Sequence, residues 1–94
     1  MTIDAIIEHV APVFGVQPDD IRSKRKPRHI SDARNAFYLI ARVNGYRWKE
    51  VGGAVNKTHS AAYYGSWACN RLMEVDRVVR DKVRTVISKL KENS

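Results

Sequence analysis

The chain has 94 residues, a length that suits one small domain and leaves no room for a second. Hydrophobic residues make up 44% and charged residues 29%, an ordinary globular balance that argues against long intrinsic disorder. The formal net charge of +7 favours an acidic partner, with nucleic acid ahead of an anionic membrane surface. One cysteine, Cys69, excludes an internal disulfide and is consistent with a reducing cytosol. No apolar run approaches the roughly 20 residues of a membrane span.

The first predicted element is an amphipathic helix over residues 3–14, where apolar residues recur at spacings of three and four. Thr2 suits its N-cap, and Gly15 suits the position after its last turn. Pro12 is expected to kink the helix or to end it near Ala11. Residues 18–20, Pro-Asp-Asp, are expected to open a single helical turn.

Residues 22–28 carry the densest positive charge of the chain, because five of these seven residues are Lys or Arg. Pro27 prevents a helix from continuing and favours an extended backbone at Lys26. We therefore expect a basic loop over 22–28. A second helix is expected over residues 32–43, with Ser31 as its N-cap.

Three more helices are predicted in the second half of the chain. A short helix over residues 48–55 contains Gly52 and Gly53, and both glycines lower helix stability. A need for close approach of another backbone segment would explain them. Thr58 is the expected N-cap of the next, over 59–73, and the last covers about 76–91, after which residues 92–94 are expected to fray. The sequence thus predicts an all-α fold: one domain over 1–94, a compact bundle of about five helices containing a helix-turn-helix at about 47–73.

Acidic residues are almost absent from the middle of the chain. Between Ala33 and Met73 the only one is Glu50, whereas Lys and Arg recur throughout. This asymmetry predicts a positive face built by the middle of the chain. Chance combined with a need for solubility would give the same pattern.

The turn before residue 59 fits a helix-turn-helix, whose second helix enters the DNA major groove by its N-terminal end. The residue types there suit base contacts, because Lys donates to guanine or phosphate, Ser and Thr suit either base type, and Ala contacts the thymine methyl. The expected base-contacting residues are Lys57, Thr58, His59, Ser60 and Ala61. Any two helices with a short turn share this outline.

Three segments carry a more specific pattern: residues 23–26 with Arg28, residues 33–36 with 38–41, and residues 50–52 with 57–60. They are similar to the Ser-Lys-Arg-Arg-x-Arg loop, the Arg-initiated Met-Ala-x-x-Leu helix, and the Glu-Ile-Gly and Arg-Asp-His-Thr-Thr-Val signature of one family. In these segments the chain resembles the C-terminal DNA-binding domain of the bacterial replication initiator DnaA, a helix-turn-helix module related in fold to the Trp repressor. The resemblance covers roughly residues 3–73.

The resemblance implies sequence-specific binding of double-stranded DNA, in replication or transcription regulation. It places residues 57–61 in the major groove and Lys26, with Arg25 beside it, in the adjacent minor groove, and it implies phosphate contacts at Arg28 and Arg34. The expected contacts to the DNA backbone or minor groove are Lys24, Arg25, Lys26, Arg28 and Arg34, and further candidates are Arg47, Lys49 and Tyr64.

Several positions depart from the family pattern. The family's Asp is Thr58 here, its second Thr is Ala61, and its following Val-Leu-His-Ala is replaced over residues 62–65. The usual recognition sequence of the family is therefore not carried over. Because no Walker-type phosphate loop occurs, we expect a stand-alone DNA reader in the cytoplasm, associated with the nucleoid, rather than a complete initiator.

The histidines and the cysteine show no pattern typical of a metal site or a catalytic site. The histidines and Cys69 lack zinc spacing and no nucleophile–base set is visible, so we expect no enzyme, metal, cofactor or small-molecule substrate. Trp48 and Trp67 are expected to pack in the core or at its rim. The alternative function is a protein-interaction module that uses the same fold with only non-specific DNA affinity. A protein partner or a homodimer is a further expectation, with the C-terminal helix as the contact surface.

Overall fold

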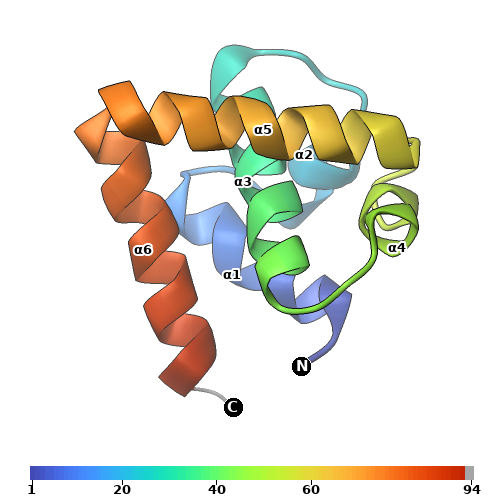
Figure 1. The fold of residues 1–94 in the computed structure, drawn as a ribbon, viewed down its shortest axis with the longest axis horizontal. Helices are drawn as coiled ribbons and strands as arrows, with labels where there is room; N and C mark the ends of the chain where they lie inside the picture. Colours follow the sequence, from blue (N-terminus) through green and yellow to red (C-terminus); the bar gives the residue numbers. More distant parts are fainter. Residues whose placement is uncertain (93–94) are drawn as a thin grey trace.

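The computed structural model describes residues 1–92, which form six helices and no strand. The helices are α1 (Ile3–Val13), α2 (Pro18–Arg22), α3 (Arg28–Val43), α4 (Trp48–Gly53), α5 (His59–Val75) and α6 (Arg77–Glu92). Figure 1 shows α5 lying across α3, with α4 at one end of α5 and α6 at the other. The all-α prediction is confirmed, and α2 is the single turn expected after Pro18. The expected fraying of residues 92–94 is wrong for Glu92, which is the last residue of α6, and Asn93 and Ser94 lie outside the described residues.

The hydrophobic core is built from one face of each long helix. Its fully buried side chains include Ile6, Ile7 and Val10 of α1, Ile30, Phe37 and Ile40 of α3, and Val83 and Val86 of α6. Burial of one such side chain contributes about 1.5–3 kcal/mol. The spacing of the apolar residues identified these faces correctly. No helix in the described part of the chain is long and apolar enough to cross a bilayer.

Helix α1 does not end near Ala11, because it continues to Val13 with Pro12 in its last turn. A proline there removes only one intrahelical hydrogen bond, and the end of the helix is closed by others. The backbone N–H of Val16 donates to Ala11 O at 3.0 Å, across Gly15 with a φ of +70°. Gly15 therefore ends α1 as predicted, since a positive φ favours glycine.

Helix α3 begins four residues earlier than the sequence predicted. Pro27 lies at the N-cap position, and its carbonyl accepts the backbone N–H groups of Ile30 and Ser31, both at 3.0 Å. The prediction of Ser31 as N-cap is wrong: its hydroxyl donates to the carbonyl of Lys26 at 3.2 Å. Proline has no N–H to lose and a φ suited to a helix start, which explains the longer helix. The connection between α2 and α3 thus shrinks to residues 23–27, and Arg28 lies in the first turn of α3.

Helices α4 and α5 are held close together at one glycine. A Cβ atom built on Gly52 would lie 2.6 Å from the carbonyl oxygen of Thr58, whereas one built on Gly53 meets nothing within 4 Å. The backbone N–H of Lys57 donates to Gly52 O at 2.8 Å, and Asn56 turns the chain with a φ of 57°. Close backbone approach therefore explains the first glycine of the pair but not the second. The short helix ends at Gly53, two residues before the predicted end.

A second glycine lets α5 cross α3. A Cβ atom on Gly65 would lie 2.5 Å from the Tyr38 ring and 2.6 Å from Asn35 Oδ1. Beyond this crossing α5 continues to Val75, two residues past its predicted end. The carboxylate of Asp76 then accepts the backbone N–H of Val78 at 2.9 Å, which starts α6.

Candidate nucleic-acid interface

The N-terminal end of α5 is an exposed, ordered corner. Thr58 is its N-cap: the hydroxyl accepts the backbone N–H of Ala61 at 3.1 Å, as the sequence predicted. Thr58, His59 and Ser60 are exposed, and Lys57 and Ala61 are half-buried. All five predicted base-contacting residues therefore lie together where α5 begins.

This corner is suited to an anionic ligand. The first turn of α5 holds no acidic residue. Helix N-termini carry partial positive charge and free backbone N–H groups, which favour phosphate. Lys57 adds a full positive charge at the same end. The hydroxyls of Thr58 and Ser60 supply hydrogen-bonding groups that can donate or accept.

The basic loop is partly neutralised by its own neighbours. Arg22 pairs with Asp4 at 3.3 Å and with Asp19 at 3.4 Å. Arg25 pairs with Asp20 at 3.2 Å.

Arg28, at the start of α3, lies 3.8 Å from Asp32, a long contact on an 81% exposed side chain. Lys24 and Lys26 are exposed and take part in none of the ion pairs found among residues 1–92. These two lysines, together with Arg28, are therefore the cations of the segment most available to phosphate.

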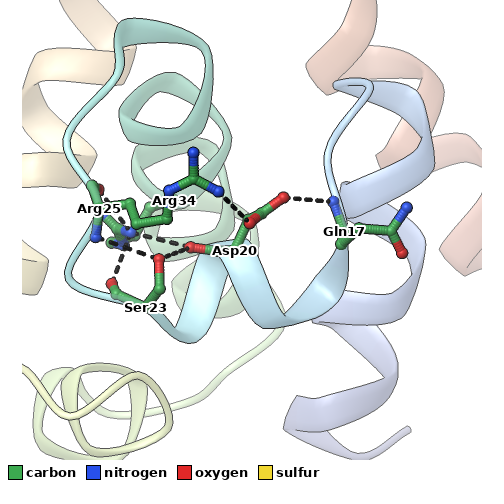
Figure 2. A network of polar contacts seen from close by, with 5 residues as sticks. All are labelled: Gln17, Asp20, Ser23, Arg25 and Arg34. Atoms are coloured by element: carbon green, nitrogen blue, oxygen red, sulfur yellow. Dashed lines mark hydrogen bonds and ion pairs between the residues drawn. The ribbon is translucent and has the colours of Figure 1, made fainter.

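Arg34 has a different place from the one implied by the resemblance. It is only 6% exposed, and its guanidinium holds the loop from inside (Figure 2). Nε donates to Ile21 O at 2.8 Å, and Nη2 donates to the carbonyls of Asp20, Ser23 and Arg25 at 3.0, 2.7 and 3.1 Å. The expectation of a direct phosphate contact is therefore corrected. Arg34 positions the basic loop, since it is buried and its Nε and Nη2 already donate to backbone carbonyls.

The same region holds the loop by further contacts (Figure 2). The Ser23 hydroxyl donates to Asp20 O at 2.7 Å and accepts the backbone N–H of Arg25 at 3.2 Å. Asp20 Oδ2 accepts the backbone N–H of Gln17 at 3.0 Å. The path of the loop is thus fixed by hydrogen bonds to α2 and α3, although its lysines are exposed.

Helix α3 connects the basic loop to α5. Arg34 binds the loop carbonyls, and the next residue, Asn35, packs against Gly65 of α5. Figure 1 shows the loop between α2 and α3 as an arc above α5. One rigid helix therefore sets the position of the loop relative to the exposed corner.

The three further candidates, Arg47, Lys49 and Tyr64, are all exposed. Trp48 is half-buried at the rim of the core, as expected, with the Arg42 guanidinium 5.5 Å from its ring centre. Trp67 differs, because it is 55% exposed and not packed in the core. It lies two residues before the buried Cys69, which places it on the outer side of α5.

Cys69 is a buried free thiol of α5. Burial raises its pKa from 9.0 to about 11, and the carboxylate of Asp32 acts in the same direction. At pH 8 the thiolate fraction is therefore about 100-fold smaller in the folded chain than in the unfolded one. Among residues 1–92, no group of three or more His, Cys, Asp or Glu side chains could hold a metal ion.

The raised pKa and the burial of the Cys69 thiol predict slow modification. At pH 8 dithionitrobenzoate should react with Cys69 at least about 100-fold more slowly in the folded protein than in the protein unfolded by urea. Because the folded pKa is the higher one, the thiol's contribution to stability is present at neutral pH and decreases above pH 9.0. Stopped-flow absorbance measures both rates. Equal rates with and without urea would contradict the burial of the thiol.

Comparison with known proteins identifies the family of this chain. A family profile described as bacterial DnaA protein helix-turn-helix matches residues 3–68. The chain is 27% identical over 92 residues to the chromosomal replication initiator protein DnaA of Thermodesulfovibrio yellowstonii, covering 96% of this chain and 21% of that protein. It is 26% identical over 96 residues to the protein of the same name from Bacteroides thetaiotaomicron, covering 100% and 20%. DnaA 2 of Chlamydia trachomatis is 25% identical over 84 residues, covering 88% and 18%.

The chain thus spans about a fifth of the length of the curated relatives it matches. The matched residues 3–68 include the basic loop, α3, α4 and the first part of α5. They contain the exposed corner at Thr58 and the buried Arg34 that orders the loop. The chain therefore belongs to the helix-turn-helix family of the bacterial DnaA protein, a family of DNA-binding domains.

Proposed function

We propose that this chain binds double-stranded DNA sequence-specifically, with the N-terminal end of α5 in the major groove. The observation that carries the proposal is the exposed corner over residues 57–61, capped by Thr58 and fixed to α4 through Gly52. A rigid frame lets short side chains discriminate bases, because their hydrogen bonds depend on position to within a fraction of an ångström.

The basic loop supplies the second part of the proposed interface. Lys24, Lys26 and Arg28 are exposed, and the carbonyls held by Arg34 fix the backbone that carries them. Lys26 is the proposed minor-groove residue, because Arg25 pairs with Asp20. Contacts to phosphate position a protein on the duplex, whereas contacts to base edges choose the sequence.

Two classes of variant separate these roles. Lys57→Ala and Ser60→Ala should change the preferred sequence, with a loss of about 1–3 kcal/mol on the parent site. Lys26→Ala and Arg28→Ala should weaken binding to all duplexes by a similar factor and reduce the salt dependence of affinity. Selection of duplexes from a random pool, followed by fluorescence anisotropy at several salt concentrations, measures both effects.

Glu50→Gln serves as the control. It removes the only negative charge between Ala33 and Met73 but changes no residue of the corner over 57–61, so the selected DNA sequence should stay the same. If both classes of variant behave identically, the assignment of the recognition helix is wrong. If the protein does not retard a random-sequence duplex in a gel-shift assay at low salt, the chain is a protein-interaction module rather than a DNA reader.

We also propose a binding role without catalysis, in the cytoplasm with the nucleoid, in replication or its regulation. Membership in a family of DNA-binding domains supports this role. The names of the relatives, chromosomal replication initiator proteins, support the link to replication. A regulatory role in transcription fits the same DNA interface.

A further inference from the structure

We propose that the outer face of α5 carries a second nucleic-acid site, which binds unpaired DNA bases by stacking. The site consists of Tyr64, Trp67 and Arg71, hereafter the aromatic stripe. Tyr64 is 66% exposed and Trp67 is 55% exposed. A 94-residue domain that leaves two large aromatic rings on one helix face in water has a surface suited to a ligand.

The stripe lies directly opposite the face of α5 that packs on the core. Ala62, Ser66 and Cys69 are the buried residues of α5. With 100° between successive helix residues, Tyr64 and Trp67 project away from them. Neither exposed ring fills the core, so core packing does not explain why Tyr64 and Trp67 are aromatic.

Neighbouring rings fix the geometry of the stripe. Tyr63 contacts Tyr64 edge-on at 5.3 Å between ring centres and Trp48 of α4 at 5.6 Å. The Arg71 guanidinium lies 5.3 Å from the centre of the Trp67 ring, an arrangement that holds one face of the indole and adds positive charge. The rings are therefore partly pre-ordered, which lowers the entropy lost on binding.

The charge around most of the stripe favours an anionic ligand. From Ala33 to Met73 Glu50 is the only acidic residue, and the one acidic residue of α5 is Glu74, one turn beyond Arg71 at the far end of the stripe. Arg71 is exposed and takes part in none of the ion pairs found among residues 1–92. Anionic charge next to flat apolar surface is the chemistry of a nucleic-acid strand.

Single strands fit this surface better than a duplex does. In a duplex the flat faces of the bases are already stacked on each other, and the outside presents sugar and phosphate. Unpaired bases leave those faces free to stack on Tyr or Trp, and arginine pairs with the phosphates between them. The stripe begins one turn after Ser60 on the same face of α5, so a strand bound there would lie next to a duplex held at the corner.

The test uses a labelled twelve-nucleotide oligo(dT) and the whole chain. Stacking contributes roughly 1–3 kcal/mol per base, so Trp67→Leu and Tyr64→Leu should each weaken binding about 5- to 150-fold. Trp67→Phe, which keeps an aromatic plane, should recover most of the affinity. Fluorescence anisotropy gives the dissociation constants, and circular dichroism verifies that each variant is folded.

Three controls make the outcome specific. Val75→Ala changes an 83% exposed apolar residue at the far end of α5 and should leave oligo(dT) binding unchanged. Ser60→Ala should weaken duplex binding and not oligo(dT) binding, which separates failure of this proposal from failure of the duplex site. A twelve-unit abasic strand should bind much more weakly than oligo(dT), because it has phosphates without bases.

Two results would overturn the proposal. Equal affinity for the abasic strand and oligo(dT) would show that only charge attracts the strand. Unchanged oligo(dT) affinity in folded Trp67→Leu and Tyr64→Leu variants would leave the stripe as a surface for a protein partner.

Discussion

Replacing Gly52 with Ala should destabilise the protein by about 3 kcal/mol, at the upper end of the cost of overpacking. The added Cβ would lie 2.6 Å from Thr58 O and 2.8 Å from Lys57 O, which are backbone atoms and cannot rotate away. The turn between α4 and α5 must then open, and it carries the Lys57 hydrogen bond to Gly52 O. Urea unfolding followed by circular dichroism measures the loss.

Gly53 provides a matched control in the same helix. A Cβ there meets nothing within 4 Å, so Gly53→Ala should leave stability unchanged or raise it by about 0.5–1 kcal/mol, because alanine loses less backbone entropy than glycine. If the two substitutions change the free energy of unfolding equally, close approach of α4 and α5 does not explain Gly52.

Replacing Arg34 with Met should have the second large effect, on both stability and DNA binding. The buried carbonyl of Ile21 and the partly buried carbonyl of Ser23 would lose their donor, and an unsatisfied buried carbonyl costs about 1–3 kcal/mol. We expect a total loss of about 3 kcal/mol. Because the loop over residues 23–27 loses its fixed path, affinity should fall for all duplex sequences alike.

Arg42→Met is the comparison for this experiment, because Arg42 lies on the same helix, is exposed and donates to a single carbonyl. It should change stability by no more than about 1 kcal/mol, because its hydrogen bond and its contact with the Trp48 ring are both exposed to solvent. Arg34→Lys should fall between the two, since an ammonium cannot reproduce the planar fork that reaches several carbonyls. Hydrogen exchange of loop amides reports the order of the loop directly. An unchanged exchange rate in Arg34→Met would contradict the positioning role.

Local patterns in the sequence predicted most of the fold. The spacing of apolar residues located α1, α3 and α6, the Thr58 cap located α5, and Thr2 caps α1 as predicted. Each of these features depends on interactions between residues a few positions apart, so it can be predicted from the sequence alone. The predicted start of α3 was wrong because two residues could begin the helix. Ser31 was the predicted N-cap, but Pro27 takes that position.

The site shows the same division. The sequence determined the exposed corner at residues 57–61, because a cap, a turn and a helix start are local features. It also determined the excess of positive charge and the family.

The tertiary structure decided which cations face the solvent. Arg34 looked like its basic neighbours until α2 and α3 enclosed it, and Trp67 looked like core until the crossing at Gly65 turned it outward. Burial depends on contacts between residues distant in the chain, and no local spacing specifies those contacts.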